Sequence, residues 1–257
     1  MASKWDPSKW EIQELYSRHP ELRKLLPPMA ILTPHSLSKF LHKYKSVYIK
    51  GRHEHTGSGI IKAWKTETGY RYVRVKGAPV DVRSIDELYE KVKDGRSARS
   101  VLIQKTIDLA TMDGRPFSIR VQVMRDRNRV WRYAGMIVKV AGEDSVVTNV
   151  RRGGGYAATI EHALARSLGY GPLKTRRVKR KLIDYGYQLV RYAAKKGIRT
   201  HEAGLDLGID RDGNIWVIEA NLAYPSYKLF DRLEDKTYYR RVNRLAAEYK
   251  LAKRKSR

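Results

Sequence analysis

The stretch that decides the fold, HEAGLDLGIDRDGNIWVIEAN at residues 201–221, places three oxygen-bearing side chains among residues suited to a buried sheet. Isoleucine, leucine, valine and tryptophan mark two strands, and RDG with its flanking Asp210 joins them as a hairpin turn. The letters DRDGN also resemble part of a calcium-binding loop, but the rest of that ligand pattern is missing. We therefore interpret the stretch as a hairpin rather than as a calcium site.

The register of this hairpin predicts that its polar groups form a cluster. If Ile209 faces Asn214 across a four-residue turn, Asp206 lies opposite Val217. One face then carries all three oxygen-bearing side chains, which are Asp206, Glu219 and Asn221. With no positive neighbour in the local sequence, these groups repel one another and lose hydration unless a hard cation neutralises them. Magnesium fits best, because it takes oxygen ligands and completes its shell with phosphate and water; a solvated strand edge with incidental acids is the alternative.

Composition indicates a globular protein that folds without disulfides. The 257 residues are enough for a substantial core, as one large domain or as two closely packed lobes. The absence of cysteine excludes disulfides, thiolate metal sites and cysteine nucleophiles, and it favours a cytoplasmic location. No window approaches the roughly 18 apolar residues of a membrane span, and the first residues lack the apolar run of a signal peptide. We therefore expect a soluble protein.

The distribution of charge predicts a polyanionic partner. The chain has 53 lysines and arginines against 27 aspartates and glutamates, a formal net charge of +26. Residues 174–199 hold ten basic residues and one acid, and residues 228–257 hold eleven and four, so these two segments carry 16 of the 26 charges. This excess exceeds what solubility needs, and it attracts acidic peptides, acidic proteins and nucleic acid alike. Charge alone does not choose among these partners, and the sequence does not set the oligomeric state.

The first part of the chain predicts helices followed by strands around a polar loop. Residues 5–41 have a helical pattern, with a proline break and a restart behind the N-cap Thr33. The strand patterns VYIKG (47–51) and IIKAWK (60–65) flank the loop RHEHTGSG. A further strand, a capped helix and the strand SVLIQK (100–105) follow.

The rest of the chain predicts a second set of strands with helices packed on it. FSIRVQVMRD (117–126) and VWRYAGMIVKVAG (130–142) alternate as a hairpin should, and the glycine-rich TNVRRGGGYA comes next. Helical spacing follows at residues 157–168 and 175–196, before the opening hairpin. The tail from Asp231 predicts a basic amphipathic helix.

Lys50 ends a predicted strand directly before the loop at residues 52–59. An ammonium group and loop amides placed in this way can meet a polyphosphate, because glycines let the backbone approach closely. The sequence contains neither a Walker motif nor a full G-x-G-x-x-G, and a lysine at a strand end is usually only solvated. Lys50 and the loop therefore do not predict a phosphate-binding site by themselves, and the interpretation depends on the motifs around them.

The order of these features resembles the nucleotide-binding core of the ATP-grasp superfamily, from about residue 26 to residue 228. The strand lysine and glycine loop are followed by SVLIQKTIDL, FSIRVQVMRD, TNVRRGGG and the hairpin segment. Within that superfamily the chain most resembles the YheC/YheD family of spore-coat-associated proteins. The motifs that carry this resemblance are LLPP, VYIKG, GSGI, PFSIRVQV, VVTNVRRGG and GLDLGIDRDGNIWVIEAN, of which the last two are the most specific.

The resemblance implies an α+β ATP-grasp fold, in which two β-rich lobes with helices enclose a nucleotide cleft. The expected division is an N-terminal helical segment, a small lobe with the phosphate loop, a large lobe with the metal site and a basic C-terminal helix or tail, at residues 1–45, 46–110, 111–230 and 231–257. Only about 45 residues precede Lys50, so we expect no full N-terminal pre-ATP-grasp domain. This leaves open whether another chain supplies part of a substrate site.

The resemblance also implies where ATP binds. Its phosphates would lie under the strand lysine and the glycine loop, with adenine against the backbone after the last strand of the small lobe. The implied ATP-binding residues are Lys50, Gly57, Ser58, Gly59, Gln104, Lys105 and Ile107.

Catalysis and metal binding are assigned by the same resemblance. Arg120 matches the arginine on the phosphate-facing strand, Arg151 is the candidate for steadying the transferred phosphoryl group, and Asn149 is the candidate for orienting a substrate. The implied magnesium ligands are Asp206, Glu219 and Asn221, in agreement with the cluster proposed above. Ser118 departs from the family pattern, which has an acid two positions before the arginine, so the charge balance near Arg120 is an open question.

The implied function is an ADP-forming carboxylate–amine ligase that uses magnesium and ATP. A carboxylate attacks the γ-phosphate, and an amine captures the resulting acyl phosphate to form an amide. An acidic peptide or protein would present the carboxylate and suit the basic surface. The alternative is a basic spore-coat or nucleic-acid-binding protein with reduced catalysis on an ATP-grasp scaffold, which the charge, Ser118 and the short N-terminal segment favour. A third hypothesis is a kinase that phosphorylates a hydroxyl group. The expected location is cytoplasmic, and the resemblance implies that the protein could also be associated with spores.

Overall fold

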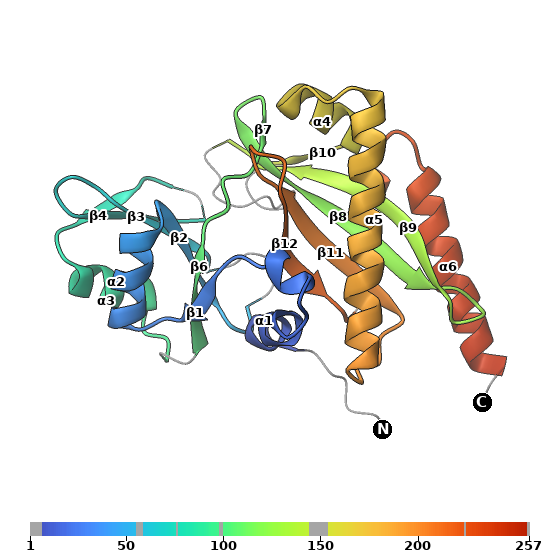
Figure 1. Cartoon of the computed structure of the whole chain (residues 1–257), viewed down its shortest axis with the longest axis horizontal. Helices are drawn as coiled ribbons and strands as arrows, with labels where there is room; N and C mark the ends of the chain where they lie inside the picture. Colours follow the sequence, from blue (N-terminus) through green and yellow to red (C-terminus); the bar gives the residue numbers. More distant parts are fainter. Residues whose placement is uncertain are drawn as a thin grey trace.

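The structure is a computed structural model of the whole chain. It describes residues 7–54, 59–75, 77–97, 100–143, 154–223 and 225–255. These residues form two six-stranded sheets with associated helices, and Figure 1 shows one sheet on the left of the view and the other on the right. In the described part of the chain, no helix is both long and apolar enough to cross a membrane. The expected mixture of helices and sheets is confirmed.

The first sheet is built from the N-terminal part of the chain. Its strands in spatial order are β1 (Met29–Ile31), β6 (Val101–Lys105), β2 (Ser46–Gly51), β3 (Ile61–Lys65), β4 (Tyr70–Arg74) and β5 (Val80–Val82). The helices that pack on it are α2 (Pro34–Lys43) and α3 (Ile85–Lys93). Val47 and Ile49 of β2 are fully buried in the core with these helices. Tyr48 and Lys50 alternate with them and therefore face the other side of the sheet.

The second sheet carries the larger core. Its strands in spatial order are β10 (Tyr156–Ala158), β9 (Trp131–Val140), β8 (Arg115–Arg125), β11 (Glu202–Ile209) and β12 (Ile215–Asn221), with β7 (Thr111–Met112) paired to β8. The helices on one face are α1 (Lys9–Ser17), α4 (Ile160–Leu168) and α5 (Pro172–Lys195). The opposite face is partly covered by the 3-10 helix η3 (Phe230–Arg232) and by α6 (Thr237–Lys255). The uncovered remainder of that face is available to line a cleft.

Alternation along β8 explains why this sheet has two different faces. Ile119, Val121 and Val123 lie in the core beneath α5, as the sequence predicts. Met124 lies in the cluster beneath α6 on the other face. Arg120 shares the parity of Met124, so its side chain leaves the core and reaches the uncovered part of the sheet.

The N-terminal region differs from the expected helical segment. After α1 and the 3-10 helix η1 (Leu22–Leu25), residues 29–31 form β1, which pairs with the edge of β6. Two prolines end the helical pattern at residues 27 and 28, and the carbonyl of Pro28 accepts a hydrogen bond from Lys105 N at 2.9 Å. Backbone pairing with an open sheet edge therefore overrides local helical periodicity. The three-residue edge strands β5 and β10 were not expected either, because runs this short have no readable period.

The β11–β12 hairpin forms as expected, but its predicted register is wrong. Ile209 pairs with Ile215, and Asp206 pairs with Glu219 rather than with Val217. The register shifts between Asp206 and Leu207, because β12 contains one extra residue at that point. This bulge changes which β12 side chains face the core.

A single carboxylate organises the turn of this hairpin, which confirms that the DRDGN sequence is a turn. Asp210 is almost fully buried and accepts hydrogen bonds from the backbone N–H groups of Asp212 (3.1 Å) and Asn214 (2.8 Å). It also accepts from the side-chain nitrogens of Asn214 (3.1 Å) and Trp216 (2.8 Å). Gly213 has a φ of 84°, a left-handed conformation that suits glycine.

Replacing Asp210 by alanine is predicted to destabilise the protein, because these donors lose a buried acceptor. We expect Asp210→Ala to lower the free energy of unfolding by about 1–3 kcal/mol. Asp212→Ala is the matched control, since Asp212 is exposed in the same turn and only its backbone N–H contacts Asp210. Urea unfolding followed by circular dichroism measures both, and equal stabilities of the two variants would contradict the role given to Asp210.

Candidate active site

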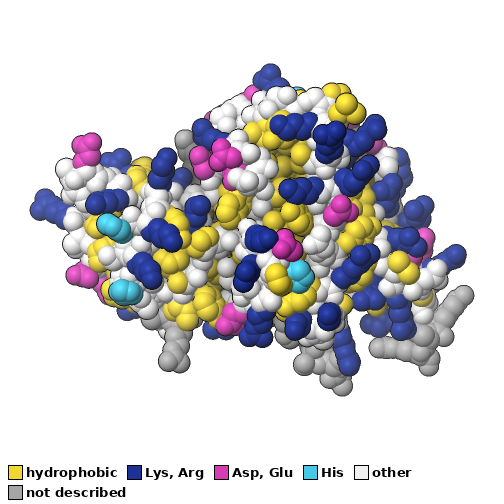
Figure 2. Space-filling model, in the orientation of Figure 1, with side chains coloured by type: hydrophobic (Ala, Val, Ile, Leu, Met, Phe, Trp, Pro, Cys, Tyr) yellow, Lys and Arg dark blue, Asp and Glu magenta, His cyan; other side chains and the backbone are white. Residues whose placement is uncertain are grey.

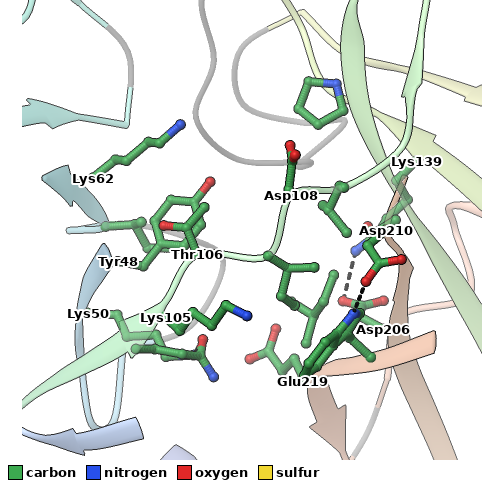
Figure 3. A pocket seen from close by; sticks show the side chains of 18 of the residues that line it. Tyr48, Lys50, Lys62, Lys105, Thr106, Asp108, Lys139, Asp206, Asp210 and Glu219 are labelled. Atoms are coloured by element: carbon green, nitrogen blue, oxygen red, sulfur yellow. Dashed lines mark hydrogen bonds and ion pairs between the residues drawn. The ribbon is translucent and has the colours of Figure 1, made fainter. Parts of the chain in front are cut away.

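A cavity of about 1430 Å³ lies between the helix-free face of the first sheet and the uncovered face of the second. Figure 3 shows Lys50, Lys62 and Lys105 on one side of this cavity and Asp206 and Glu219 on the other. The volume exceeds the 300–1,000 Å³ typical of small-molecule pockets, so the cleft has room for a large ligand or for two ligands. We refer to it as the main cleft.

Lys50 projects from β2 into the main cleft, where it is buried. Its ammonium group donates a 2.7 Å hydrogen bond to the side-chain oxygen of Gln104, which lies on the neighbouring strand β6. Burial lowers the pKa of Lys50 to about 8, although attraction to Glu219 opposes this shift. A cation held next to a neutral amide and a more distant carboxylate remains attractive to an anionic ligand.

Asp206 forms the centre of a charged cluster on the second sheet. Arg120 of β8 donates to both carboxylate oxygens, at 2.6 and 3.1 Å, and Lys139 of β9 donates to one oxygen at 2.7 Å. Burial raises the pKa of Asp206, but attraction to these two cations outweighs that effect and holds the pKa well below its usual range. Glu219, the partner of Asp206 on β12, also attracts Arg120 and Lys139, so two cations and two carboxylates face the cleft.

Gly204 makes room for this cluster. It lies two residues before Asp206 on β11, and its partner on β12 is Asn221. A Cβ atom at position 204 would lie 2.8 Å from a terminal nitrogen of Arg120 and 2.7 Å from the Pro225 ring. The glycine therefore lets the guanidinium group lie flat across β11 and reach Asp206 in bidentate geometry.

The bulge in β12 turns the other two predicted magnesium ligands toward the cleft. In a regular strand Val217, Glu219 and Asn221 would lie on the same face. Here Val217 packs in the core, whereas Glu219 and Asn221 line the main cleft. The extra residue opposite the step from Asp206 to Leu207 produces this change of face. The prediction that Asp206, Glu219 and Asn221 share one face is therefore met through a register that the sequence did not indicate.

A short linker crosses between the sheets along the cleft. Leu109 bridges to Asp210 at the hairpin turn, and Arg211 N donates to the carbonyl of Asp108 at 3.2 Å. At the end of β6, just before this linker, the ammonium group of Lys105 lies over the Tyr44 ring, 5.6 Å from its centroid, and over the Trp216 ring, 5.3 Å from its centroid. Aromatic and cationic groups thus surround the place where the first sheet meets the hairpin.

The described ends of the loop after Lys50 are fixed by Glu54. Its carboxylate accepts a hydrogen bond from Gly51 N at 3.1 Å and pairs with Arg96 at 2.8 Å. Lys9 of α1 donates from its ammonium group to the carbonyl of Glu54, and from its backbone N–H to the carbonyl of Arg52 at 3.1 Å. The base of this loop is therefore tied to the N-terminal helix.

The structure brings together most of the residues that the sequence singled out. The predicted site residues that line the main cleft are Lys50, Gln104, Lys105, Ile107, Arg120, Asp206, Glu219 and Asn221. Gly59 is described with a φ of 73° beside Glu54, and its neighbour Ile60 is the one that lines the cleft. Gly57, Ser58, Asn149 and Arg151 lie outside the described residues.

Two cleft residues were not singled out from the sequence. Lys139 is a lysine within the otherwise apolar run MIVKV, and a charged residue at a buried strand position is the signal that could have revealed it. Trp216 marks a predicted strand, and it lines the cleft with its indole N–H donating to Asp210. Ser118 is also buried in the cleft wall, and the counter-charge of Arg120 comes from Asp206 rather than from position 118.

Comparison with known proteins identifies the family of this chain. Residues 1–252 match the YheC/D like ATP-grasp family. The chain belongs to the YheC/D-like ATP-grasp family. It is also 26% identical over 226 residues to the endospore coat-associated protein YheD of Bacillus subtilis (strain 168). That match covers 83% of this chain and 47% of the relative, so the chain spans about half the length of the curated protein that it matches.

ATP-grasp proteins typically bind ATP with magnesium, and the donor set here fits a magnesium ion that arrives with phosphate. Within the described part of the chain, no group of three or more acidic or histidine side chains could hold a metal by itself. The carboxylate of Asp206 already pairs with the side chains of Arg120 and Lys139, and the side-chain oxygen of Asn221 accepts a hydrogen bond from the backbone N–H of Ala223 at 3.1 Å. Glu219, with Asn221 and Asp206 beside it, would supply one or two ligands, and phosphate oxygens and water would complete the shell.

Binding of a nucleotide to the main cleft is predicted to weaken above pH 8. Lys50 carries its charge below its pKa of about 8 and loses it as the pH rises. If a bound triphosphate requires the charged form, the dissociation constant should rise roughly tenfold between pH 7 and pH 9. Isothermal titration with a non-hydrolysable magnesium-ATP analogue measures this change. Lys50→Arg is the control, because arginine stays charged over the whole range and should flatten the profile.

Proposed function

We propose that this protein is an ATP-dependent carboxylate–amine ligase. The observation that carries the proposal is the placement of Lys50 on one wall of a single cleft and of Arg120, Asp206 and Glu219 on the other. The lining of this cleft includes ten basic and six acidic side chains, so it favours an anionic ligand such as a triphosphate. Family membership supports ligase-like use of ATP.

The proposed reaction has two balanced steps. A carboxylate oxygen of the substrate attacks the γ-phosphorus, the bond from that phosphorus to the β-phosphate oxygen breaks, and ADP leaves. The nitrogen of an amine then attacks the acyl carbon, loses a proton to solvent or to a base, and expels inorganic phosphate as the amide forms. Magnesium would supply charge neutralisation on the phosphates.

The side chains of the cleft suit these steps through position and charge. Lys50 would hold the phosphates from the side of the first sheet, and Arg120 with Lys139 would face the transferred phosphoryl group from the second sheet. The roles expected for Arg151 and Asn149 remain part of the proposal. Tyr48 and Ile218 line opposite walls of the cleft and would enclose the adenine near the backbone that follows Gln104.

An acidic peptide or protein is the acceptor that the surface favours. Lys and Arg side chains are spread over the part of the molecule occupied by α5 and α6, as Figure 2 shows in the orientation of Figure 1. On α5 the exposed basic residues include Arg176, Arg177, Arg180 and Lys181. The same charge also supports the second candidate function, a basic coat or nucleic-acid-binding protein on an ATP-grasp scaffold.

Glu219→Gln is predicted to abolish ligase activity without unfolding the protein. Removal of one negative ligand at the phosphates should lower magnesium-dependent ADP release by roughly 100-fold or more. Asp108→Asn is the matched control, because Asp108 lines the same cleft and pairs with the exposed Arg211. Asp206→Asn should lose activity as well, but it would also leave Arg120 and Lys139 without their buried counter-charge. ADP release and complementation in cells both report the outcome, and persistence of cellular function in Glu219→Gln would favour the non-enzymatic candidate.

The basic face of α5 is predicted to recruit the acidic substrate. Poly-L-glutamate should stimulate ADP release at low salt, and the stimulation should fall about tenfold when Arg176, Arg177 and Arg180 are changed to glutamate. The exposed position of these residues leaves basal activity and stability nearly unchanged. Single-stranded DNA serves as the comparison polyanion in the same salt titration. If both polyanions bind weakly and equally and neither stimulates ADP release, the basic face of α5 does not recruit the substrate.

A further inference from the structure

A second cavity, of about 260 Å³, adjoins the main cleft on the side of helix α1. Lys50, Gln104, Glu219 and Asn221 line both cavities, so the side chains proposed to hold phosphate and magnesium form the boundary between them. A group held in this small cavity would therefore lie next to the transferred phosphate. We call it the α1 pocket.

The charge of the α1 pocket favours a small anion. Its charged lining residues are Lys9, Lys50 and Glu219, two cations against one carboxylate. The ammonium group of Lys9 donates to the carbonyl of Glu54, which carries no formal charge. Burial, together with repulsion from Lys9, lowers the pKa of Lys50, which indicates that the two ammonium groups are close enough to repel each other. An anion placed between them would relieve this repulsion.

The remaining walls of the α1 pocket suit the carbon skeleton of a small molecule. Apolar side chains line one side, namely Ile12, Leu26, Met29, Val217 and Leu222. The Gln13 amide donates from its nitrogen to the carbonyl of Pro27 at 3.2 Å, which leaves its oxygen as an acceptor. The Gln104 amide uses its oxygen to accept from Lys50, which leaves its nitrogen as a donor. A cation, an amide donor, an amide acceptor and an apolar wall together match a carboxylic acid of amino-acid size.

We propose that the α1 pocket binds the carboxylate to be activated, as an acyl group of amino-acid size whose carboxylate faces Lys9 and Lys50. The inference rests on the proposed ligase function and deepens it, because it names the substrate class and the place of that substrate. A pocket of about 260 Å³ cannot hold a folded protein segment, so only one residue enters it. That residue is either a free acid or the terminal residue of a peptide that reaches in from the basic surface.

The test compares carboxylate binding with nucleotide binding in two variants. The probes are the twenty standard amino acids and unbranched mono- and dicarboxylic acids of two to five carbons, added with a non-hydrolysable magnesium-ATP analogue. We expect at least one acid to give saturation-transfer NMR signals with the wild type. Lys9→Gln should weaken its binding tenfold or more and the analogue affinity by a clearly smaller factor, because Lys9 also anchors the base of the loop after Lys50. Lys24→Gln, on the exposed side of the same N-terminal region, is the control. Ala223→Leu, which adds bulk to the α1 pocket without changing its charge, should weaken the acid by a similar factor.

The outcomes separate this inference from the proposed function. Failure of the analogue to bind the wild type overturns the proposed function. Binding of the analogue without binding of any acid overturns the assignment of the α1 pocket alone, as does a loss of analogue affinity in Lys9→Gln that equals the loss for the acid. Tripeptides ending in the best acid identify the source: tighter binding than the free acid supports a peptide terminus, and weaker binding supports a free acid. Circular dichroism confirms that each variant is folded.

Discussion

The pairing of Asp206 with Arg120 and Lys139 is the interaction on which the geometry of the cleft depends. Three adjacent strands each contribute one of these groups, so the cluster can form only if β9, β8 and β11 lie in this order. Buried charges destabilise a fold unless they are paired, and here one carboxylate pairs with two cations. Glu219 of β12 attracts both cations as well, so the charges of these four side chains balance. The order of the strands therefore fixes charged side chains of both signs at the surface of the cleft.

The bulge in β12 solves a conflict between packing and chemistry. A regular strand would place Val217, Glu219 and Asn221 on one face, so either the valine would leave the core or the two polar groups would enter it. One extra residue opposite the step after Asp206 allows both requirements to be met. Trp216 precedes the bulge and faces the cleft because it alternates with Val217, and Asp210 fixes its indole ring there. A defect in strand pairing is thus what creates the polar wall.

The sequence revealed the elements whose signals are local and missed those that depend on pairing between distant segments. Caps at Thr33 and Ser84, the alternation of β8 and the helical spacing of α5 are all readable within about ten residues. The strand β1 forms because its backbone pairs with β6, and the bulge in β12 forms because Val217 packs in the core. The sequence-based argument for magnesium assumed that the three oxygen ligands had no cation nearby. That assumption failed for Asp206, whose partners lie 86 and 67 positions earlier in the chain.

The two sheets are coupled to each other at both ends of the cleft. At one end the linker after β6 pairs with the hairpin turn through Leu109 and Asp210. At the other end, α1 packs in the core of the second sheet, where the Tyr16 hydroxyl donates to the carbonyl of Leu189, and the same helix binds the loop base through Lys9. Closure of the cleft by rotation of the whole first sheet would break one of these connections. The two connections therefore hold Lys50 and Gln104 of the first sheet in place relative to the acidic hairpin of the second.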